Sequence, residues 1–252
     1  MEHFHVRVVR CALILEPDKI YADALRRLSL SVLTKATVRI AASVDEAQRA
    51  LATFPADLLI TGVGPSLAGD GLDFIAGCTE VPSRLDRVLV VTTHREHRQL
   101  MVLRQLPVQG VFDSASESCD QFVAALRLVA AGGVYWSRTF LDLLHRPAGE
   151  THSLFILLTA AEQLVLAIVG DGSDDAAAAR ELGLSPATIS TVRRNLHRKL
   201  GVQHRGELVR IAAQTGFVRF TPAGVIRPGF GLLEAACRRR HRSRKPLECL
   251  AV

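Results

Sequence analysis

The sequence lacks the features of a membrane-spanning or secreted protein. No apolar run in its 252 residues approaches the roughly 18 residues needed to cross a bilayer. The first residues, MEHFHVRVVR, contain no apolar signal segment and no cleavage site. The five cysteines are odd in number and have no CxxC spacing, which argues against a disulfide framework or a zinc site. We therefore expect a cytoplasmic protein that binds no membrane.

The sequence also lacks the patterns typical of an enzyme. It shows no Gly-rich phosphate loop, no nucleophile paired with a base and no two carboxylates at a useful spacing. Its nine histidines are scattered, and His94 and His97 have no other metal-ligand types near them in sequence. We expect no catalysis, no cofactor and no metal.

The net charge of +6 is unevenly distributed. Residues 1–150 are almost neutral, whereas residues 221–252 hold seven Lys or Arg against two Asp or Glu. Six of those cations lie in RRRHRSRK, residues 238–245. Such a run is usually solvated, and the alternative is contact with a phosphate backbone. We expect residues 221–252 to be a basic, flexible tail.

Strand and helix patterns alternate over residues 10–131. Short apolar runs predict five strands, at 11–15, 37–41, 57–61, 87–92 and 110–112. Amphipathic patterns between them predict helices, the last of which ends before Gly132-Gly133. This alternation favours an α/β domain with a doubly wound, parallel five-stranded sheet. Residues 132–155 show no periodicity and are interpreted as a linker.

Beyond the linker, residues 156–220 have helical periodicity only, which predicts an all-α domain of four helices. The expected spans are 160–169, 174–182, 186–200 and 205–214. Asp174 and Ser185 are predicted N-caps, and Pro186 occupies a first helical position, where its missing N–H costs nothing. Gly183 and Gly201 end the second and third helices.

The third helix has two different faces. Its apolar positions, at steps of three or four residues, are Ile189, Val192, Leu196 and Leu200. The opposite face presents Ser190, Thr191, Arg194, Asn195 and Arg198. A short helix, a glycine turn and a cationic helix with small polar residues near its start suit a reader of the DNA major groove. An ordinary helix with a solvated basic face is the alternative.

The segment LTAAEQLVLAIVGDG…ARELGLSPATISTVRRNLHRKLGVQHRGELV resembles the LuxR-type helix-turn-helix domain of NarL/FixJ response regulators. The resemblance implies a four-helix DNA-binding domain. It places the base-reading side chains at Ser190, Thr191 and Arg194. The contacts to phosphates or the flank are placed at Thr188, Arg193, Asn195, Arg198, Lys199 and Arg205. The chain departs from the family at Ala177, Ala178 and Ser190, so its base preference need not follow the family.

Residues 10–131 resemble a receiver domain, which catalyses its own phosphorylation on an aspartate after the third strand. That position falls on Gly62, which cannot attack phosphorus, unless the strand has been misplaced. The family's acidic pair, which holds Mg²⁺, falls on Glu16 with Asp18 displaced by Pro17. Thr92 matches the family's hydroxyl position, while the phosphate-binding lysine falls on Asp113 or Ser114. These positions predict a degenerate phosphorylation site in a pseudo-receiver.

Together these patterns favour a transcriptional regulator that binds double-stranded DNA, independently of aspartate phosphorylation, as a homodimer. The receiver-like domain is expected to supply a surface for the dimer or for another protein. The alternative is a protein-interaction module that sequesters a partner or responds to a ligand and no longer reads DNA. One Trp and two Tyr do not support the aromatic acyl-lactone pocket of some LuxR-type proteins. A further alternative is that the receiver pocket, no longer used for phosphorylation, binds another ligand.

Overall fold

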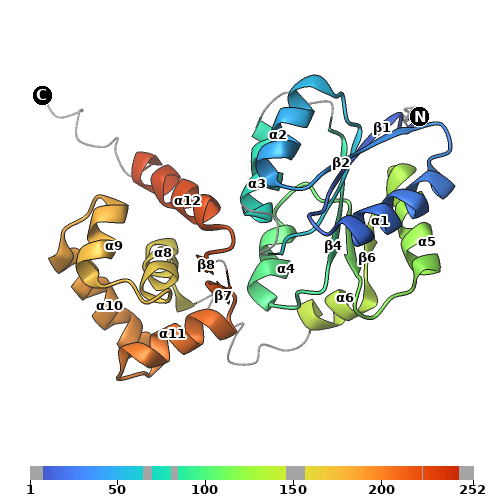
Figure 1. Ribbon diagram of the computed structural model, residues 1–252. Coiled ribbons are helices and arrows are strands. Elements are labelled where there is room, and N and C mark those ends of the chain that lie inside the picture. The colour runs from blue at the N-terminus through green and yellow to red at the C-terminus, as the bar shows by residue number, and fades with distance from the viewer. Residues whose placement is uncertain (1–7, 65–69, 81–84, 146–156, 223, 244–252) are drawn as a thin grey trace, which may run out of the picture. The chain divides into compact units, whose positions relative to one another are not determined.

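The computed structural model describes residues 8–64, 70–80, 85–145, 157–222 and 224–243. The chain divides into two compact units, one built largely from residues 1–146 and the other largely from residues 147–252 (Figure 1).

The N-terminal unit is a doubly wound α/β domain around one parallel sheet, as predicted. The sheet has six strands, not the expected five, in the order β2-β1-β3-β4-β5-β6. They are β1 (Cys11–Leu15), β2 (Thr37–Ala41), β3 (Leu58–Thr61), β4 (Arg87–Thr92), β5 (Gly110–Asp113) and β6 (Tyr135–Trp136). Every residue of β3, β4 and β5 is buried, which explains why these strands are continuous apolar runs instead of alternating ones.

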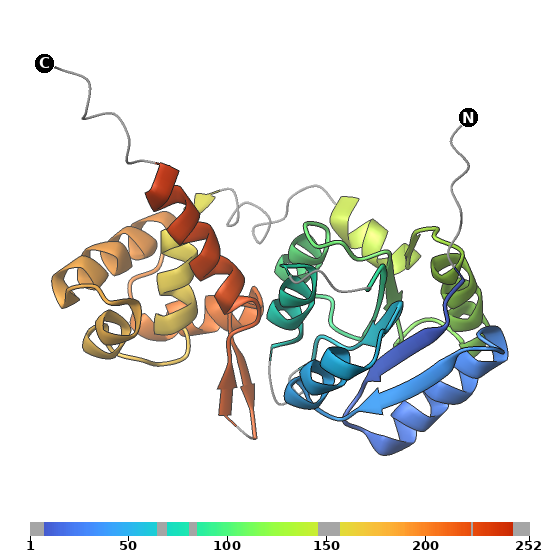
Figure 2. The same cartoon turned by 90° about the horizontal axis from the view of Figure 1, so that it is seen from above.

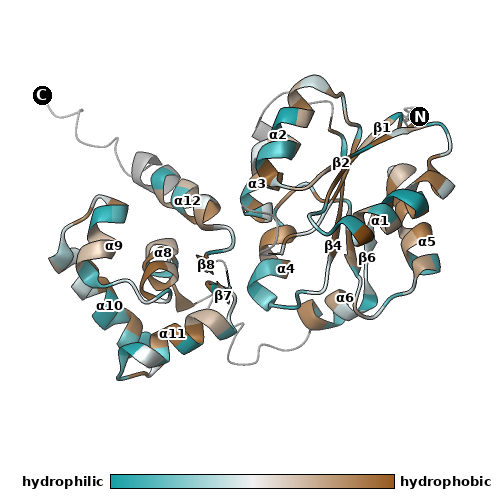
Figure 3. Ribbon diagram, in the orientation of Figure 1, coloured by the Kyte–Doolittle hydropathy of each residue, from teal (hydrophilic) through white to brown (hydrophobic). Residues whose placement is uncertain are grey.

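Helices cover both faces of this sheet (Figure 1). They are α1 (Lys19–Val32), α2 (Val44–Thr53), α3 (Gly71–Glu80), α4 (His97–Leu103) and α5 (Cys119–Ala130). α1 and α5 pack together on one face, where Leu25 and Phe122 join side chains of the central strands in one core. The hydropathy colouring of Figure 3 shows the same division, with hydrophobic inner strands and hydrophilic residues on the outer helices.

Residues 132–145 are ordered structure, which corrects the expected linker. Tyr135 N donates to Gln109 O at 2.8 Å and Ser137 N to Val111 O at 2.9 Å, so β6 pairs with the edge of β5. α6 (Arg138–His145) follows directly. A two-residue strand leaves almost no periodic signal, and its pairing satisfies edge groups of β5 that local sequence does not reveal. The rest of the expected linker, from residue 146, lies outside the described residues.

The C-terminal unit contains the four predicted helices at nearly the predicted positions. They are α8 (Ala160–Val169), α9 (Asp175–Leu182), α10 (Pro186–Leu200) and α11 (Arg205–Gln214). α8 is buried along almost its whole length and forms the centre of the core. Ile189 and Leu196 of α10 and Leu208 of α11 are fully buried around it.

The segment expected to be a flexible tail is also largely folded. β7 (Arg219–Thr221) and β8 (Gly224–Ile226) form an antiparallel hairpin, and α12 (Phe230–Ser243) packs against α8 (Figure 2). Phe230 and Leu233 lie against the core of the unit. These apolar residues precede the basic run and give α12 a surface to bury. The prediction of a flexible tail rested on the charge count and did not take them into account. Residues 244–252 lie outside the described residues.

Candidate nucleic-acid interface and receiver-like pocket

The turn between α9 and α10 is set by local chemistry. Gly183 has φ of 65° in the left-handed region and ends α9, as only glycine does without strain. Ser185 Oγ then accepts a hydrogen bond from Thr188 N at 3.1 Å, which caps α10. Pro186 begins the helix. The result is a helix-turn-helix with the predicted caps.

The outward face of α10 carries the residues that the sequence placed there. Thr191, Arg194 and Arg198 are exposed, and Ser190 is half-buried beside them. Because Ile189 and Leu196 are fully buried, the opposite side of the helix faces solvent.

The polar contacts of this face stay on α10 itself. Thr191 Oγ1 donates to Ala187 O at 2.9 Å, Arg194 Nη2 donates to Thr191 Oγ1 at 3.3 Å, and Arg198 Nη2 donates to Asn195 Oδ1 at 3.1 Å. Within the described residues, no carboxylate pairs with Arg194 or Arg198. Both guanidinium groups are therefore placed to receive an outside partner.

Arg193 is arranged differently from its neighbour Arg194. Its Nε and Nη2 atoms both donate to the Asp175 carboxylate at 2.9 Å, which joins α10 to the start of α9. This hydrogen bond lowers the pKa of Asp175 and raises that of Arg193. A two-point contact of this kind fixes the angle between the two helices as well as their distance.

Lys199 and Arg205 also make contacts inside the domain. Lys199 Nζ contacts Glu162 Oε2 at 2.7 Å and Leu157 O at 3.1 Å. Burial raises the pKa of Glu162, but hydrogen bonds from Lys199 and Thr159 outweigh burial and lower the pKa overall. Arg205 Nη2 donates to Gly172 O at 2.8 Å and also to Ser173 O. Sequence reasoning did not predict these bracing contacts, because the partners lie 18 to 42 residues apart.

In the N-terminal unit, the positions of the expected phosphorylation site gather at one edge of the sheet. Glu16 follows β1, Gly62 follows β3, Thr92 ends β4 and Asp113 ends β5, and all four strands are parallel. A Cβ at Gly62 would lie 3.7 Å from Val91 O and 3.9 Å from Gly64 N, which are ordinary contacts. The surrounding backbone therefore leaves room for a Cβ at residue 62.

The acidic residues after β1 are engaged locally. Glu16 Oε1 accepts a hydrogen bond from Asp18 N at 2.9 Å, and Asp18 Oδ1 caps α1 by accepting from Tyr21 N at 2.9 Å. Burial raises the pKa of Glu16. Burial also raises the pKa of Tyr21, against the effect of a hydrogen bond with Ser114. Asp18 thus serves the helix end, where a receiver would direct a second carboxylate to Mg²⁺.

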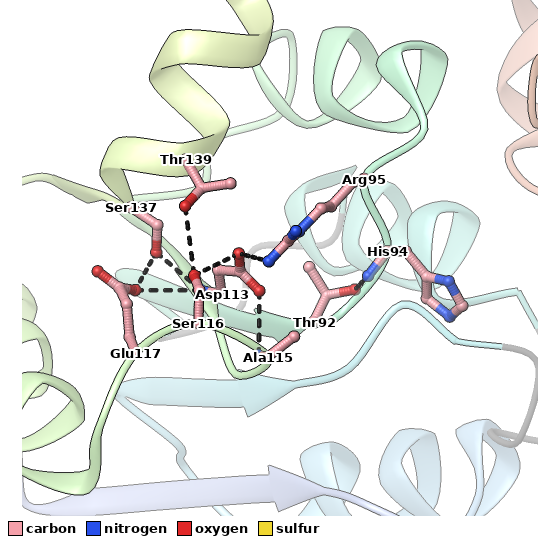
Figure 4. A network of polar contacts seen from close by, with 9 residues as sticks. All are labelled: Thr92, His94, Arg95, Asp113, Ala115, Ser116, Glu117, Ser137 and Thr139. Atoms are coloured by element: carbon pink, nitrogen blue, oxygen red, sulfur yellow. Dashed lines mark hydrogen bonds and ion pairs between the residues drawn. The ribbon is translucent and has the colours of Figure 1, made fainter.

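Asp113, one of the two residues predicted at the lysine position of a receiver, is the centre of a polar network (Figure 4). Its side chain is fully buried. Asp113 Oδ2 accepts from Arg95 Nη2 at 2.7 Å and from Ser116 Oγ at 2.7 Å, and Asp113 Oδ1 accepts from Ala115 N at 3.0 Å. At the neighbouring strand end, Thr92 Oγ1 accepts from His94 N at 3.0 Å. The Asp113 carboxylate therefore already has an arginine partner and two further hydrogen-bond donors within this unit.

Residues from the β6 segment complete this network. Asp113 N donates to Ser137 Oγ at 2.7 Å and to Glu117 Oε2 at 3.2 Å. Glu117 also accepts from Ser137 Oγ, and from Tyr135 OH at 2.5 Å. Burial together with the bond to Glu117 raises the pKa of Tyr135 to about 12. Tyr135 and Ser137 carried no sequence signal for the site, because only the pairing of β6 with β5 brings them to Asp113. Arg95 and Glu117, in the loops after β4 and β5, were also not among the predicted site residues.

The described residues contain no group of three or more His, Cys, Asp or Glu side chains arranged to hold a metal ion. No helix in the described ranges is both long and apolar enough to cross a membrane.

Residues 157–212 match the family model described as bacterial regulatory proteins of the luxR family. The matched segment spans α8, α9, α10 and most of α11, and it contains the helix-turn-helix described above.

Two curated proteins are similar to the chain. The transcriptional regulatory protein MctR of Rhizobium johnstonii is 36% identical over 101 residues, which cover 40% of this chain and 46% of MctR. The transcriptional regulatory protein UhpA of Escherichia coli K12 is 29% identical over 175 residues, which cover 69% of this chain and 84% of UhpA. The chain therefore spans about half the length of MctR and most of UhpA.

Two solved structures share the fold. RcsB from Salmonella enterica serovar Typhimurium, bound to promoter P1flhDC in the presence of phosphomimetic BeF3-, has a TM-score of 0.55 at 21% identity. The aligned region covers 81% of this chain and 98% of the RcsB chain. A structure of two RcsB dimers bound to two parallel DNAs has a TM-score of 0.53 at 20% identity. The aligned region covers 82% of this chain and 98% of that RcsB chain.

Proposed function

We propose that this protein is a sequence-specific, DNA-binding transcriptional regulator whose binding does not depend on aspartate phosphorylation. The observation that carries the first part is the outward face of α10, where two arginines without carboxylate partners in the described residues stand beside small polar side chains. Such a face suits the major groove, because an arginine can donate two hydrogen bonds to a guanine edge.

We assign base contacts and phosphate contacts to these residues by the exposure of each side chain. Ser190, Thr191 and Arg194 read base edges. Contacts to phosphates or the flank fall to Thr188, Asn195 and Arg198, and to the exposed edges of Arg193, Lys199 and Arg205. The last three are also braced inside the domain, so they contribute less to base choice than to position.

The proposal of phosphorylation independence rests on Gly62 and Asp113. Glycine has no group that could accept a phosphoryl group, and the carboxylate of Asp113, unlike a lysine, has no hydrogen-bond donor to offer a phosphoryl anion. RcsB is described as dimers bound to DNA, and a dimer of this chain would contact two half-sites about one helical turn apart.

A partner-binding module that no longer reads DNA is the second candidate. One observation favours it: Arg193 and Lys199 have structural partners, so the domain would retain them even without DNA binding. Arg194 and Arg198, which have no carboxylate partner among the described residues, favour the DNA reader instead, because their hydrogen bonds stay on α10 and hold no other element.

Selection from a random DNA pool tests the proposal. Full-length protein without phosphodonor is incubated with the pool at about 0.15 M salt, and the bound DNA is sequenced. We expect an enriched motif of two half-sites. The Arg194→Ala variant should lose enrichment at defined positions, while Arg127→Ala, which removes an exposed arginine from α5, should select the same motif. Salt-sensitive bulk binding without a motif would instead support the partner-binding candidate.

A further inference from the structure

Arg227 lies between the hairpin and α12, outside the segment that matches the luxR family model, and it contacts both ends of the region around α9. Its Nε atom donates to Asp171 Oδ2 at 2.9 Å, and its two Nη atoms contact Asp171 and Glu181. Asp171 lies in the turn before α9 and Glu181 lies in the last turn of that helix. One guanidinium group therefore joins the start and the end of α9.

The contact with Asp171 is largely shielded from solvent, whereas the Glu181 side chain is 40% exposed. The side chains of Arg227 and Asp171 are 18% and 11% exposed. The Arg227 guanidinium also lies 5.1 Å from the centre of the Phe230 ring, and Phe230 packs on the core of the domain. Burial alone would lower the pKa of Arg227, but the hydrogen bonds to Glu181 and Asp171 outweigh it and raise the pKa. The planar guanidinium group of an arginine that bonds two carboxylates fixes the orientation of the elements it joins, which a flexible surface ion pair does not.

The turn before α9 receives arginines from two further elements. Arg193 of α10 binds Asp175, and Arg205 of α11 binds the Gly172 and Ser173 carbonyl groups. Arg227 therefore completes a set of three arginines, from three elements, around residues 171–175. Arg193 connects this region to α10, which is the proposed recognition helix. Displacement of α9 would therefore alter the angle of α10.

We propose that residues 219–243 are an integral part of the DNA-binding domain and that Arg227 is a positioning residue for the recognition helix. This inference rests on the proposed function for its effect on DNA, but its structural half stands apart from DNA. Arg227 acts through Asp171 and Glu181 and touches no base. The functional domain then extends about thirty residues beyond the family match.

The test compares full-length Arg227→Gln with Arg238→Gln. Both variants remove one positive charge from the same extension, but Arg238 is 76% exposed and contacts only Glu234, at 3.5 Å, among the described residues. Hydrogen exchange of the free protein reports on α9 and α10. The affinities for the selected motif and for an unrelated duplex are measured over a range of salt concentrations, well below the melting temperature.

We expect Arg227→Gln to accelerate exchange in residues 171–190 and to weaken binding to the motif about 10-fold. Binding to the unrelated duplex and the salt slope should not change, because no phosphate contact is lost. Arg227→Lys should recover only part of the affinity, since one ammonium group cannot bond both carboxylates. Arg238→Gln should leave exchange and the motif preference unchanged.

Three results would overturn the proposal. Unchanged exchange in residues 171–190 of Arg227→Gln would show that the contact does not hold α9. An equal loss for motif and unrelated DNA, with a salt slope reduced by about 1, would make Arg227 a phosphate contact. A lower melting temperature with an unchanged motif preference would make its role purely structural. If the wild-type protein selects no motif, the proposed function fails, and hydrogen exchange alone still decides whether Arg227 positions α9.

Discussion

Arg95 donates a hydrogen bond to Asp113 at 2.7 Å, and this ion pair lies where a receiver domain would bind phosphate. Arg95 lies in the loop after β4 and Asp113 is the last residue of the neighbouring strand β5, so the pair joins a loop to a strand end at one edge of the sheet. Asp113 is fully buried, while the Arg95 side chain is 44% exposed. The receiver-like fold thus holds a buried carboxylate and its arginine partner at this edge of the sheet.

We predict that Arg95→Met destabilises the N-terminal unit by about 1–2 kcal/mol. Loss of one partner from a buried pair costs about 3–5 kcal/mol, but the exposure of Arg95 allows water to compensate in part. Urea unfolding, followed by a probe in the N-terminal unit, measures the change. The matched control is Arg138→Met, whose ion pair with Asp142 is exposed on both sides and should contribute less than about 0.5 kcal/mol. Equal effects of the two substitutions would contradict this account of the network.

We predict that Gly62→Asp folds normally but does not become phosphorylated. A Cβ at residue 62 would make only ordinary contacts, so the substitution starts without a backbone clash. The lysine that would bind the phosphoryl group is absent, however, and Asp113 occupies that place. Incubation with Mg²⁺ and a small-molecule phosphodonor, followed by intact-mass measurement, tests the prediction. A stable mass increase of one phosphoryl group would show that the remaining residues still support the chemistry.

Arg193 and Arg194 are adjacent but should have different roles. Arg193→Ala removes the two-point contact to Asp175 and should destabilise the C-terminal unit by about 1–3 kcal/mol. Arg194→Ala should change stability by less than about 0.5 kcal/mol and should reduce discrimination at one base position by about 1–3 kcal/mol. Thermal unfolding and binding to single-base variants of the motif separate the two effects. The reverse assignment would show that α10 is oriented differently on DNA.

The C-terminal unit should lose stability in acid. The hydrogen bond from Arg193 lowers the pKa of Asp175, and hydrogen bonds outweigh burial to lower the pKa of Asp171 and Glu162. A carboxyl whose pKa is lowered by folding contributes fully above its ordinary value, here 3.8 for aspartate and 4.5 for glutamate. That contribution disappears as the pH falls below these values through the folded-state pKa.

Urea midpoints between pH 7 and pH 3 measure this effect. The control is Arg193→Gln, in which Asp175 should return toward its ordinary pKa. The variant should start less stable at pH 7 and lose less stability between pH 5 and pH 3 than the wild type. Parallel pH profiles for the two proteins would mean that Arg193 does not stabilise the charged form of Asp175.

Local chemistry explains which parts of the structure the sequence predicted. Gly183 and Ser185 set the helix-turn-helix because a left-handed glycine and a side-chain cap act within a few residues. β6 was missed because Tyr135 and Trp136 become a strand only by pairing with the edge of β5. Arg95 was missed for a similar reason, since its partner Asp113 lies 18 residues away on the next strand. Patterns of neighbouring residues predict elements, whereas the pairing of distant charges depends on the assembled sheet.

One titration decides whether DNA binding by this protein depends on phosphorylation. The dissociation constant of the full-length protein for its selected motif is measured at about 0.15 M salt, with and without Mg²⁺ and a small-molecule phosphodonor. We predict the same constant under both conditions, because Gly62 offers no acceptor and the Arg95–Asp113 pair occupies the phosphate position. A tightening of tenfold or more on addition of the phosphodonor would contradict the account.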